Sequence, residues 1–312
     1  MDKKPYRDLN TYYRTIFNGK TAKISLDGGF TCPNRDGSLG TGGCIFCSAG
    51  GSGDFAESAS LSIPQQIARG KRQTAEKWEN PHYIAYFQAF TNTYAPVSVL
   101  RQKYEEALAQ PHIEGLSIAT RPDCLPFDVL ELLGELAQKT HLWVELGLQT
   151  AKEETAKFIV RGYSNPVFER AVGELHKRKI PVVVHLILGL PHETEWDMMA
   201  SIDYLNHLPI HGVKLQLLHV LQHTPLAKLY ERGSYTPLSK EVYVDLVCKC
   251  IARLRSDIVV HRLTGDGDRN LLLAPLWSLD KRNVLNTIHR ELRLRNIKQG
   301  DDFQGTDAPH SF

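Results

Sequence analysis

Seven short apolar runs, separated by longer helical stretches, constrain the fold of this chain more than any other feature of its sequence. The runs cover residues 23–26, 83–88, 115–120, 142–149, 180–190, 213–220 and 258–263. Between them the sequence predicts helices over residues 62–80, 97–109, 126–139, 151–178, 193–207 and 239–255. The helical period is explicit in residues 126–139, because Val129, Leu132 and Leu136 fall on one face. Regular alternation of strands and helices predicts a parallel sheet with right-handed crossovers.

This pattern predicts an α/β fold, a partial (β/α)6 barrel of the TIM type, rather than a Rossmann sheet. Six strands belong to the barrel repeat and the seventh is a late addition. We expect the barrel to cover residues 21–265, with a short N-terminal extension over 1–20 and a basic, helical C-terminal extension over 266–312. The N-terminal extension is rich in tyrosine and basic residues, which suits a solvated segment as well as a substrate-binding arm.

In barrels of this kind the chemistry lies at the carboxyl ends of the strands. Polar residues or glycines stand at those ends in residues 88–92, 120–123, 149, 189–191 and 261–266. Within the strand at 142–149, Glu145 and Gln149 share one side while the alternate residues are aliphatic, so both should point into the barrel. A buried carboxylate needs a partner. Glu145 therefore forms an internal salt bridge or faces a polar ligand, and Gln149 on the same side favours the ligand.

The glycine-rich loop after the first strand carries Cys32, Cys44 and Cys47. The last two have the C-x-x-C spacing that lets two thiolates converge on one metal centre. No histidine precedes His82, so a fourth ligand for a structural zinc ion is missing nearby. A zinc loop and redox or buried thiols remain alternatives. The sequence favours a 4Fe–4S cluster with one iron left open, the kind of site that cleaves S-adenosylmethionine (SAM) to a radical.

Composition and net charge limit the classes of protein to which the chain could belong. Hydrophobic residues make up 42% of the 312-residue chain and charged residues 23%, as in ordinary soluble enzymes. The net charge is +2, so any nucleic-acid contact must come from local patches. No apolar run approaches the ~20 residues that cross a bilayer, and the N-terminus lacks a signal-peptide core, so we expect no membrane association. Unpaired cysteines with metal-ligand spacing indicate a reducing compartment, the cytoplasm.

Seven motifs carry a family resemblance. They are CPNRDG at 32–37, CIFC at 44–47, YFQAFTNTY at 86–94, TRPD at 120–123, ELGLQ at 145–149, LGLPHET at 188–194 and HRLTGD at 261–266. Together they resemble the radical SAM superfamily, and within it the YtqA/YhcC-type group. That group is related to the elongator catalytic subunit and to oxygen-independent coproporphyrinogen oxidase. Eleven residues separate Cys32 from Cys44, more than the common C-x₃-C-x₂-C spacing, and the elongator relatives share a longer first gap.

The resemblance implies a set of cofactor-binding residues, while no catalytic residue is assigned. Cys32, Cys44 and Cys47 would ligate three irons of the 4Fe–4S cluster, with SAM on the fourth. Phe46 would pack beside the adenine, and Gly189 would let the backbone approach the adenosine. The remaining SAM or substrate contacts would come from Gln88, Asn92, Glu145, Gln149 and Arg161.

Other candidates are weighed against ordinary structural roles. Two roles are open for Cys124, a donor of a hydrogen atom in the reaction and a buried structural thiol, and the second is favoured. Cys248 and Cys250 stand two apart on a predicted helix, so their side chains do not converge and we expect neither to be a ligand. His185 and His219 lie in apolar strands, where histidines are more often hydrogen-bonded core residues than ligands.

The substrate is suggested by a basic C-terminal stretch and by the resemblance. The stretch contains Lys281, Arg282, Arg290, Arg293, Arg295 and Lys298, which suits a phosphate backbone or a solvated helix. The elongator relatives act on the wobble uridine of tRNA. The resemblance therefore implies a tRNA substrate, conversion of carboxymethylaminomethyl-uridine to aminomethyl-uridine, and an electron donor such as flavodoxin or ferredoxin. A small-molecule substrate, or a non-catalytic metal-stabilised RNA-binding protein, is the alternative.

Overall fold

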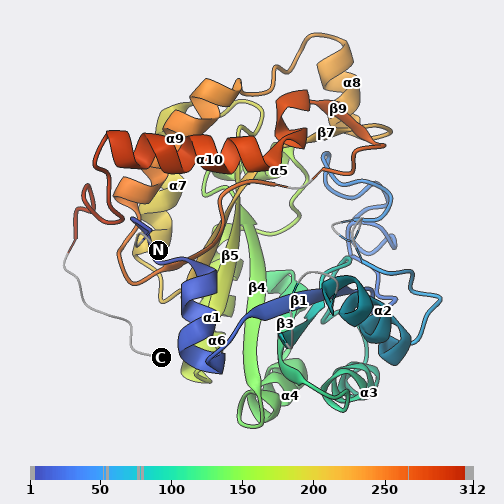
Figure 1. The fold of residues 1–312 in the computed structure, drawn as a ribbon. Helices are drawn as coiled ribbons and strands as arrows, with labels where there is room; N and C mark the ends of the chain where they lie inside the picture. The colour runs from blue at the N-terminus through green and yellow to red at the C-terminus, as the bar shows by residue number, and fades with distance from the viewer. Residues whose placement is uncertain are drawn as a thin grey trace.

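A parallel sheet of seven strands forms the centre of the protein (Figure 1). The computed structural model describes residues 4–51, 53, 56–75, 78, 81–265 and 267–305. The sheet order is β1-β2-β3-β4-β5-β6-β8, so strands that follow one another in the chain lie side by side. Its strands are β1 (Thr21–Leu26), β2 (His82–Phe87), β3 (Ile113–Thr120), β4 (His141–Gln149), β5 (Val182–Leu188), β6 (Gly212–Leu217) and β8 (Val259–Arg262). All seven predicted strands are present, and the predicted partial α/β barrel is confirmed.

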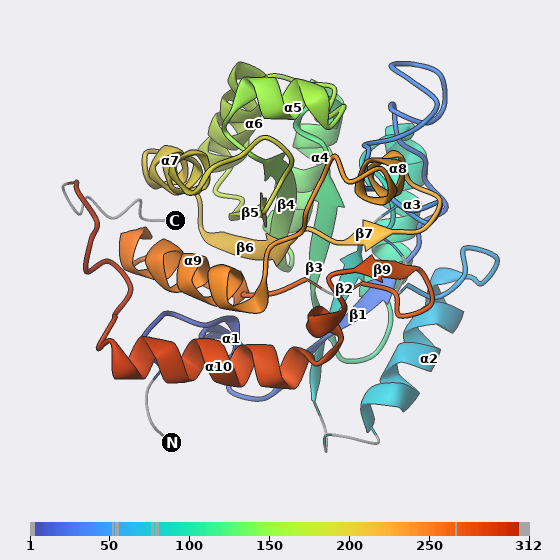
Figure 2. The ribbon, with the colours of Figure 1, turned by 90° about the horizontal axis from the view of Figure 1, so that it is seen from above.

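Helices cover the outer face of this curved sheet, as the view from above shows (Figure 2). They are α2 (Ile63–Ala75), α3 (Val97–Leu108), α4 (Phe127–Ala137), α5 (Glu153–Phe158), α6 (Asn165–Lys177), α7 (Glu195–Asn206) and α9 (Lys240–Arg253). The strand residues that pack against these helices are apolar: Leu26, Phe87, Ile118 and Val144 are completely buried in one core cluster. The periodic residues of α4 are buried against the sheet, as its sequence predicted.

The predicted helix over 151–178 is in fact two helices, α5 and α6. Between them Gly162 has φ +85° and Val160 has φ +57°, which no continuous helix allows. Pro166 then lies in the first turn of α6, a position that proline favours. Residues 76, 77, 79 and 80 of the predicted helix 62–80 lie outside the described residues, as do Asp266 and residues 306–312.

The N-terminal segment folds onto the barrel, so the interpretation of residues 1–20 as a solvated extension is wrong for its described part. Helix α1 (Leu9–Phe17) begins at Asp8, whose carboxylate accepts hydrogen bonds from two backbone N–H groups of the first turn. Its Tyr13 is buried against Trp143 on β4, with ring centroids 5.4 Å apart. Asp8 also bridges to Val260, so the segment contacts both β1 and the last strand of the sheet.

The C-terminal part adds a second layer beyond β6. Helix α10 (Lys281–Leu294) packs along α9 and buries Val284, Ile288 and Leu292 (Figures 1 and 2). Strands β7 (Val220–Leu221) and β9 (Leu272–Ala274) pair antiparallel, and the short helix α8 (Pro225–Glu231) follows β7. Two 3₁₀ turns, η1 (Pro122–Cys124) and η2 (Leu276–Leu279), complete the elements. Within the described residues no helix is long and apolar enough to span a bilayer.

Candidate active site

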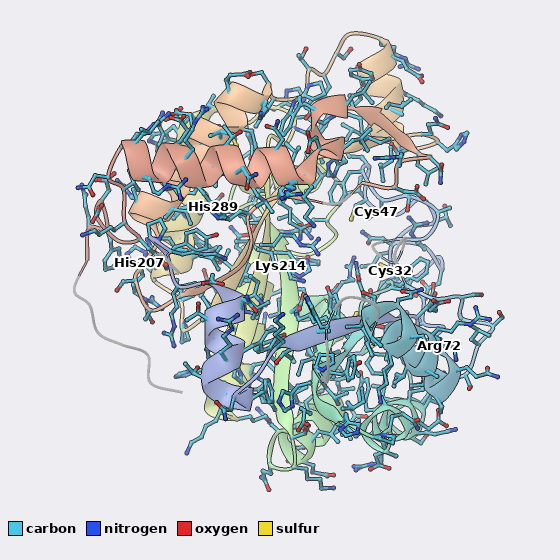
Figure 3. All side chains as sticks on the ribbon, viewed as in Figure 1. Cys32, Cys47, Arg72, His207, Lys214 and His289 are labelled. Carbon is cyan, nitrogen blue, oxygen red and sulfur yellow. The ribbon has the colours of Figure 1, made fainter. Side chains whose placement is uncertain are left out.

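Cys32, Cys44 and Cys47 line one cavity of about 170 Å³ at the carboxyl ends of the strands. The loop that carries the cysteines follows β1, and the strand ends supply the opposite wall (Figure 3). That wall consists of Thr91, Ala119, Thr120, Arg121, Glu145, Gly147, Gln149, His185, Ile187 and Gln216, with Arg161 and Tyr163 from the segment after α5. The loop thus brings the three thiols to one polar cavity.

Arg35 and Gly43 hold the loop in its folded-back shape. The Arg35 guanidinium donates hydrogen bonds to the carbonyl oxygens of Cys47 at 3.3 Å and Ser48 at 2.5 Å. Gly43 has φ +74°, and a Cβ added there would stand 2.9 Å from the Arg35 Nε. Glycine is therefore required at this position for both backbone and space. The Gly43 N–H donates to the carbonyl of Asn34, which draws the two ends of the loop together.

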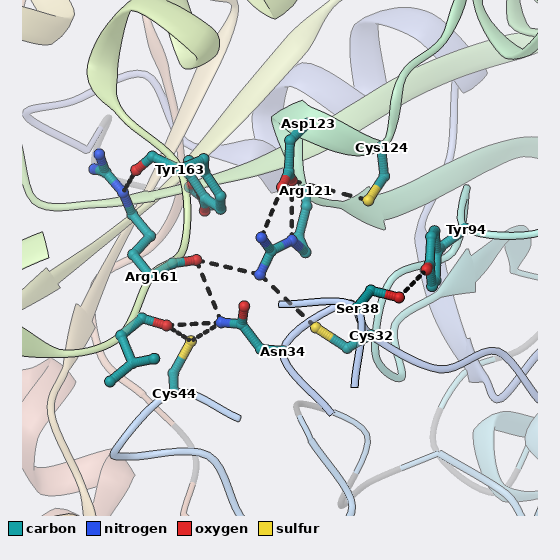
Figure 4. Close-up of polar contacts among 12 residues, drawn as sticks. Cys32, Asn34, Ser38, Cys44, Tyr94, Arg121, Asp123, Cys124, Arg161 and Tyr163 are labelled. Carbon is teal, nitrogen blue, oxygen red and sulfur yellow. Dashed lines mark hydrogen bonds and ion pairs between the residues drawn. The ribbon is translucent and has the colours of Figure 1, made fainter. Parts of the chain in front are cut away.

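Cationic and amide donors surround the thiols (Figure 4). Arg121 Nη1 lies 3.9 Å from the Cys32 sulfur, and Asn34 Nδ2 lies 3.6 Å from the Cys44 sulfur. A hydrogen bond from Cys47, with the nearby Arg121 and Asn34, lowers the pKa of Cys44 to about 7 despite its burial, while the same bond and burial raise the pKa of Cys47. Because metals bind thiolates rather than thiols, and donors to the sulfurs tune iron–sulfur clusters, this environment suits a thiolate-bound cluster.

The number of thiols bears on the kind of metal centre that the site could hold. A structural zinc ion needs four protein ligands around one point. Among the described residues, no group of three or more histidine, cysteine, aspartate or glutamate side chains is arranged to hold a metal ion. An open-site 4Fe–4S cluster needs three thiolates, each on a different iron. All three cysteines are free and line the same cavity, so the chain supplies that donor set.

The sequence-predicted SAM contacts divide into two groups. Phe46, Glu145, Gln149 and Arg161 line the cysteine cavity, and Gln88 lines an adjoining cavity. Gln149 has φ +67°, an uncommon conformation for a residue with a side chain and one often found at functional sites.

Asn92 and Gly189 line neither of these two cavities. The Asn92 amide donates to the Ala119 carbonyl at 2.8 Å. Gly189 has φ +88°, and its carbonyl accepts a hydrogen bond from the Tyr235 hydroxyl at 2.8 Å.

Glu145 is the centre of a buried ionic network that the strand pattern only partly predicted. Its side chain is fully buried, and it forms an ion pair with Lys23 of β1 at 2.7 Å and another with Lys214 of β6. Three further donors reach the carboxylate: Ser117 at 2.7 Å, Tyr86 at 2.9 Å and His185 at 2.6 Å. Although burial alone would raise it, the two ammonium groups hold the pKa of Glu145 well below its usual range. The internal salt bridge considered from the sequence is therefore present.

Lys23 and Lys214 are the site residues that the sequence reasoning missed. Each is a lone lysine in an apolar strand of a parallel sheet, which is the signal that was available. Burial, partly offset by Glu145, lowers the pKa of Lys214 to about 7. Burial together with Lys214 lowers the pKa of His185 to about 4, so this imidazole is neutral at pH 7.

Arg161 forms hydrogen bonds with the backbone around the site. Its guanidinium donates to the carbonyl oxygens of Leu148 and Thr150, both at 2.9 Å, and its Nε donates to that of Tyr163 at 2.9 Å. It lies only 1% exposed and also stands 4.9 Å from the ring centre of Tyr163. The segment after β4 is therefore fixed against the cavity by this one side chain.

The remaining cysteines and histidines have structural surroundings. Cys248 and Cys250 are buried in α9, as expected for residues that are not ligands. Cys124 is buried, and burial raises its pKa to about 12. His185 bonds Glu145 and also lines the cysteine cavity, and the His219 Nε2 lies 3.1 Å from the Ser278 hydroxyl.

The basic C-terminal stretch is only partly available for an anion. Arg295 pairs with Asp245 and, at 3.4 Å, with Glu291, which also pairs with Arg290 at 3.1 Å. Arg293 and Lys298 instead line a groove of about 1060 Å³ between the N-terminal segment and the end of α10. Its other basic lining residues are Lys4, Arg7 and Arg14, and its one acidic lining residue among those described is Asp8.

Comparisons with known proteins give matches over most of the chain. Residues 35–205 match the family model described as the Radical SAM superfamily, and residues 210–293 match the model described as Radical_SAM C-terminal domain. The uncharacterized protein YtqA of Bacillus subtilis is 48% identical over 96% of this chain and 94% of its own length. Protein YhcC of Escherichia coli is 37% identical over 90% of both chains.

A solved structure supports the fold. The archaeal Elp3 of Methanocaldococcus infernus, with an N-terminal deletion, superimposes with a TM-score of 0.68 at 16% identity. The match covers 90% of this chain and 64% of the archaeal one, so the present chain spans about two thirds of that protein.

Proposed function

Since the chain belongs to the radical SAM superfamily, we propose that Cys32, Cys44 and Cys47 hold its 4Fe–4S cluster and leave one iron open for SAM. The cluster and SAM are the cofactors of this superfamily, and the resemblance read from the sequence motifs is confirmed. The observation that carries the ligand assignment is the convergence of the three thiols on one cavity. When bound, the two cofactors supply a 5′-deoxyadenosyl radical that removes a hydrogen atom from an unactivated carbon.

The chain's own residues bind, orient and shield these groups. Asn34 and Arg121 direct N–H groups at two of the sulfurs, which stabilises thiolates. Arg161 fixes the backbone after β4, and we assign SAM contacts to Phe46 and Gln149 because both line the cysteine cavity. A cavity enclosed by loop and strand ends limits the access of water to a reactive radical.

We assign the other sequence-predicted residues more indirect roles. Glu145 lines the cavity but is engaged by two lysines, so it balances charge behind the cofactor. Gln88 contacts whatever occupies the adjoining cavity. Asn92 and Gly189 position the strand ends through the bonds to Ala119 and Tyr235.

We propose tRNA as the substrate and remodelling of the wobble-uridine side chain as the reaction. The conversion begins with loss of a hydrogen atom from the methylene of the carboxymethyl group, and loss of one further electron and a proton gives an imine. Water hydrolyses the imine, so the carbon–nitrogen bond breaks to give aminomethyl-uridine and glyoxylate. The motif resemblance to the elongator catalytic subunit supports this class of substrate. The basic groove lined by Arg7, Arg14, Arg293 and Lys298 supports it physically, because clustered cations bind a phosphate backbone.

A one-electron donor such as flavodoxin or ferredoxin completes the proposal, because the reductive cleavage of SAM consumes an electron. We place the protein in the cytoplasm. All six cysteines are free, and thiols stay reduced there.

Nucleoside mass spectrometry of tRNA from a deletion strain tests the substrate. We expect carboxymethylaminomethyl-uridine to accumulate and aminomethyl-uridine to disappear, and a plasmid copy of the wild-type gene to reverse both changes. A Cys44→Ala copy should fail to reverse them. An unchanged nucleoside profile would contradict the tRNA proposal and favour the alternative of a small carboxylate substrate.

A further inference from the structure

A second cavity, of about 140 Å³, adjoins the cysteine cavity. The two share lining residues on both the loop and the sheet, so they are neighbouring compartments of one interior: Phe46, Cys47, Gly51, His185, Ile187 and Gln216. The second cavity alone reaches Lys214 on β6, Arg262 on β8 and Gln88 after β2. It therefore lies on the side of the thiols that faces the last strands of the sheet.

The lining of this second cavity is cationic. Lys214 and Arg262 are its basic lining residues, and none of its described lining residues is an aspartate or glutamate. Behind the wall, two ammonium groups, those of Lys23 and Lys214, share the single carboxylate of Glu145. A buried ammonium group in excess over its counter-charge is costly, so it loses its proton more readily, as Lys214 does, unless an anion accompanies it.

The geometry of Lys214 leaves room for one more acceptor. An ammonium group has three N–H donors. The described residues give Lys214 two acceptors: the Tyr86 hydroxyl at 3.1 Å and the Glu145 carboxylate. Tyr86 in turn donates its own proton to Glu145 at 2.9 Å, so this hydroxyl is fixed in orientation. Lys214 is 6% exposed in its side chain and faces the cavity from a rigid strand.

We propose that this second cavity binds a carboxylate of the substrate and that Lys214 is its ion-pair partner. The inference rests on the proposed function and deepens it, because the carboxymethylaminomethyl group ends in a carboxylate. A carboxylate held by Lys214 directs the adjacent methylene toward the compartment that the thiols line. The same chemistry would also suit the carboxylate of SAM, and the experiment below separates the two sources.

The test compares an acid with its amide on the reconstituted, SAM-loaded enzyme. The probes are the nucleoside 5-carboxymethylaminomethyl-uridine and its primary amide, titrated calorimetrically. We expect the wild type to prefer the acid by about tenfold to a hundredfold, the size of one charge-assisted hydrogen bond. This comparison needs no variant. Equal affinity for acid and amide would overturn the inference.

Two matched lysine variants assign the preference to a residue. Lys214→Met should abolish the preference for the acid. Lys23→Met should retain it, since Lys23 shares Glu145 but does not line the cavity. Lys214→Gln serves the same purpose if the methionine variant does not fold. Loss of the preference in Lys23→Met as well would overturn the inference. So would a Lys214→Met enzyme with weakened SAM affinity and an unchanged acid-to-amide ratio, because the lysine would then serve SAM.

A fragment pair separates this inference from the tRNA proposal. N-methylglycine and N-methylglycinamide carry the same carboxymethylamine unit without uridine, and their binding is followed by saturation-transfer NMR. Lysine-dependent binding of the acid fragment, together with an unchanged tRNA nucleoside profile in the deletion strain, would refute the tRNA substrate and keep the carboxylate site. If no probe shows a preference for the acid but the nucleoside profile of the deletion strain is altered, the carboxylate site is refuted and the tRNA substrate is kept.

Discussion

Replacing Glu145 with glutamine should destabilise the fold strongly, although the side chain keeps its size. The carboxylate is fully buried and receives five donors, two of them ammonium groups. The amide removes the charge and turns an N–H₂ donor toward groups that also donate. Breaking a buried ion pair by removing one partner costs about 3–5 kcal/mol, and we expect a loss of free energy of unfolding in this range.

Urea unfolding of Glu145→Gln, measured beside the wild type and Glu131→Gln, tests this value. Glu131 pairs with Arg178 on the surface and is 53% exposed in its side chain, so its variant should lose less than about 1 kcal/mol. The pKa of Glu145 is held below its ordinary 4.5, so the advantage of the wild type should be present above that pH. It should shrink as the pH falls through the lowered pKa.

Two results would refute the reasoning about Glu145. A loss of less than about 1 kcal/mol would mean that the carboxylate does not balance the two lysines. Unchanged stability together with weakened SAM binding would mean that Glu145 contacts the cofactor directly. A double-mutant cycle with Lys214→Met should give a coupling energy of about 1–3 kcal/mol, because the two side chains touch.

Three further outcomes follow from the site. Arg161→Lys should lose about 2–4 kcal/mol in thermal unfolding, since lysine lacks the fork that reaches three backbone carbonyls; an unchanged melting temperature would contradict that role. Gly43→Ala should lower the iron content without unfolding the barrel, because its Cβ would displace the Arg35 guanidinium; full iron loading would contradict it. Burial raises the pKa of Glu193 to about 7, so wild-type stability should fall as the pH rises from 4.5 to 7. Glu193→Gln should therefore gain about 1–3 kcal/mol above pH 7 and almost nothing below pH 4, measured by urea unfolding.

The barrel was predictable because short, mainly apolar strands alternate regularly with longer helical stretches, although polar residues such as Lys23 and Glu145 interrupt them. Helix α1 was missed because its sequence is mixed and its aromatic face has meaning only against the strand starts that carry Trp143 and His141. The break between α5 and α6 had local signals in Gly162 and Pro166. The helix-forming residues around these two nevertheless favour one continuous helix.

The candidate site was predictable where it depends on residue types that have few roles in proteins. Three cysteines in a glycine-rich loop after a strand indicate a metal centre, and they do share a cavity. The lysine pair on Glu145 could not be derived, because Lys23 and Lys214 lie 122 and 69 residues from it in the chain. The hydrogen bonds from Arg161 to backbone carbonyl groups could not be derived either, because carbonyl oxygens have no sequence signature.

The central claim is that Cys32, Cys44 and Cys47 hold an open-site 4Fe–4S cluster. Its most direct test is the iron and sulfide content of anaerobically reconstituted Cys44→Ala, with the yield of 5′-deoxyadenosine on adding dithionite and SAM. Cys124→Ala is the matched control, because this buried thiol lies outside the cysteine cavity. We predict that Cys44→Ala stays folded but loses the cluster and the product, while Cys124→Ala keeps both. Wild-type SAM cleavage by Cys44→Ala, or zinc in place of iron in the wild type, would contradict the claim.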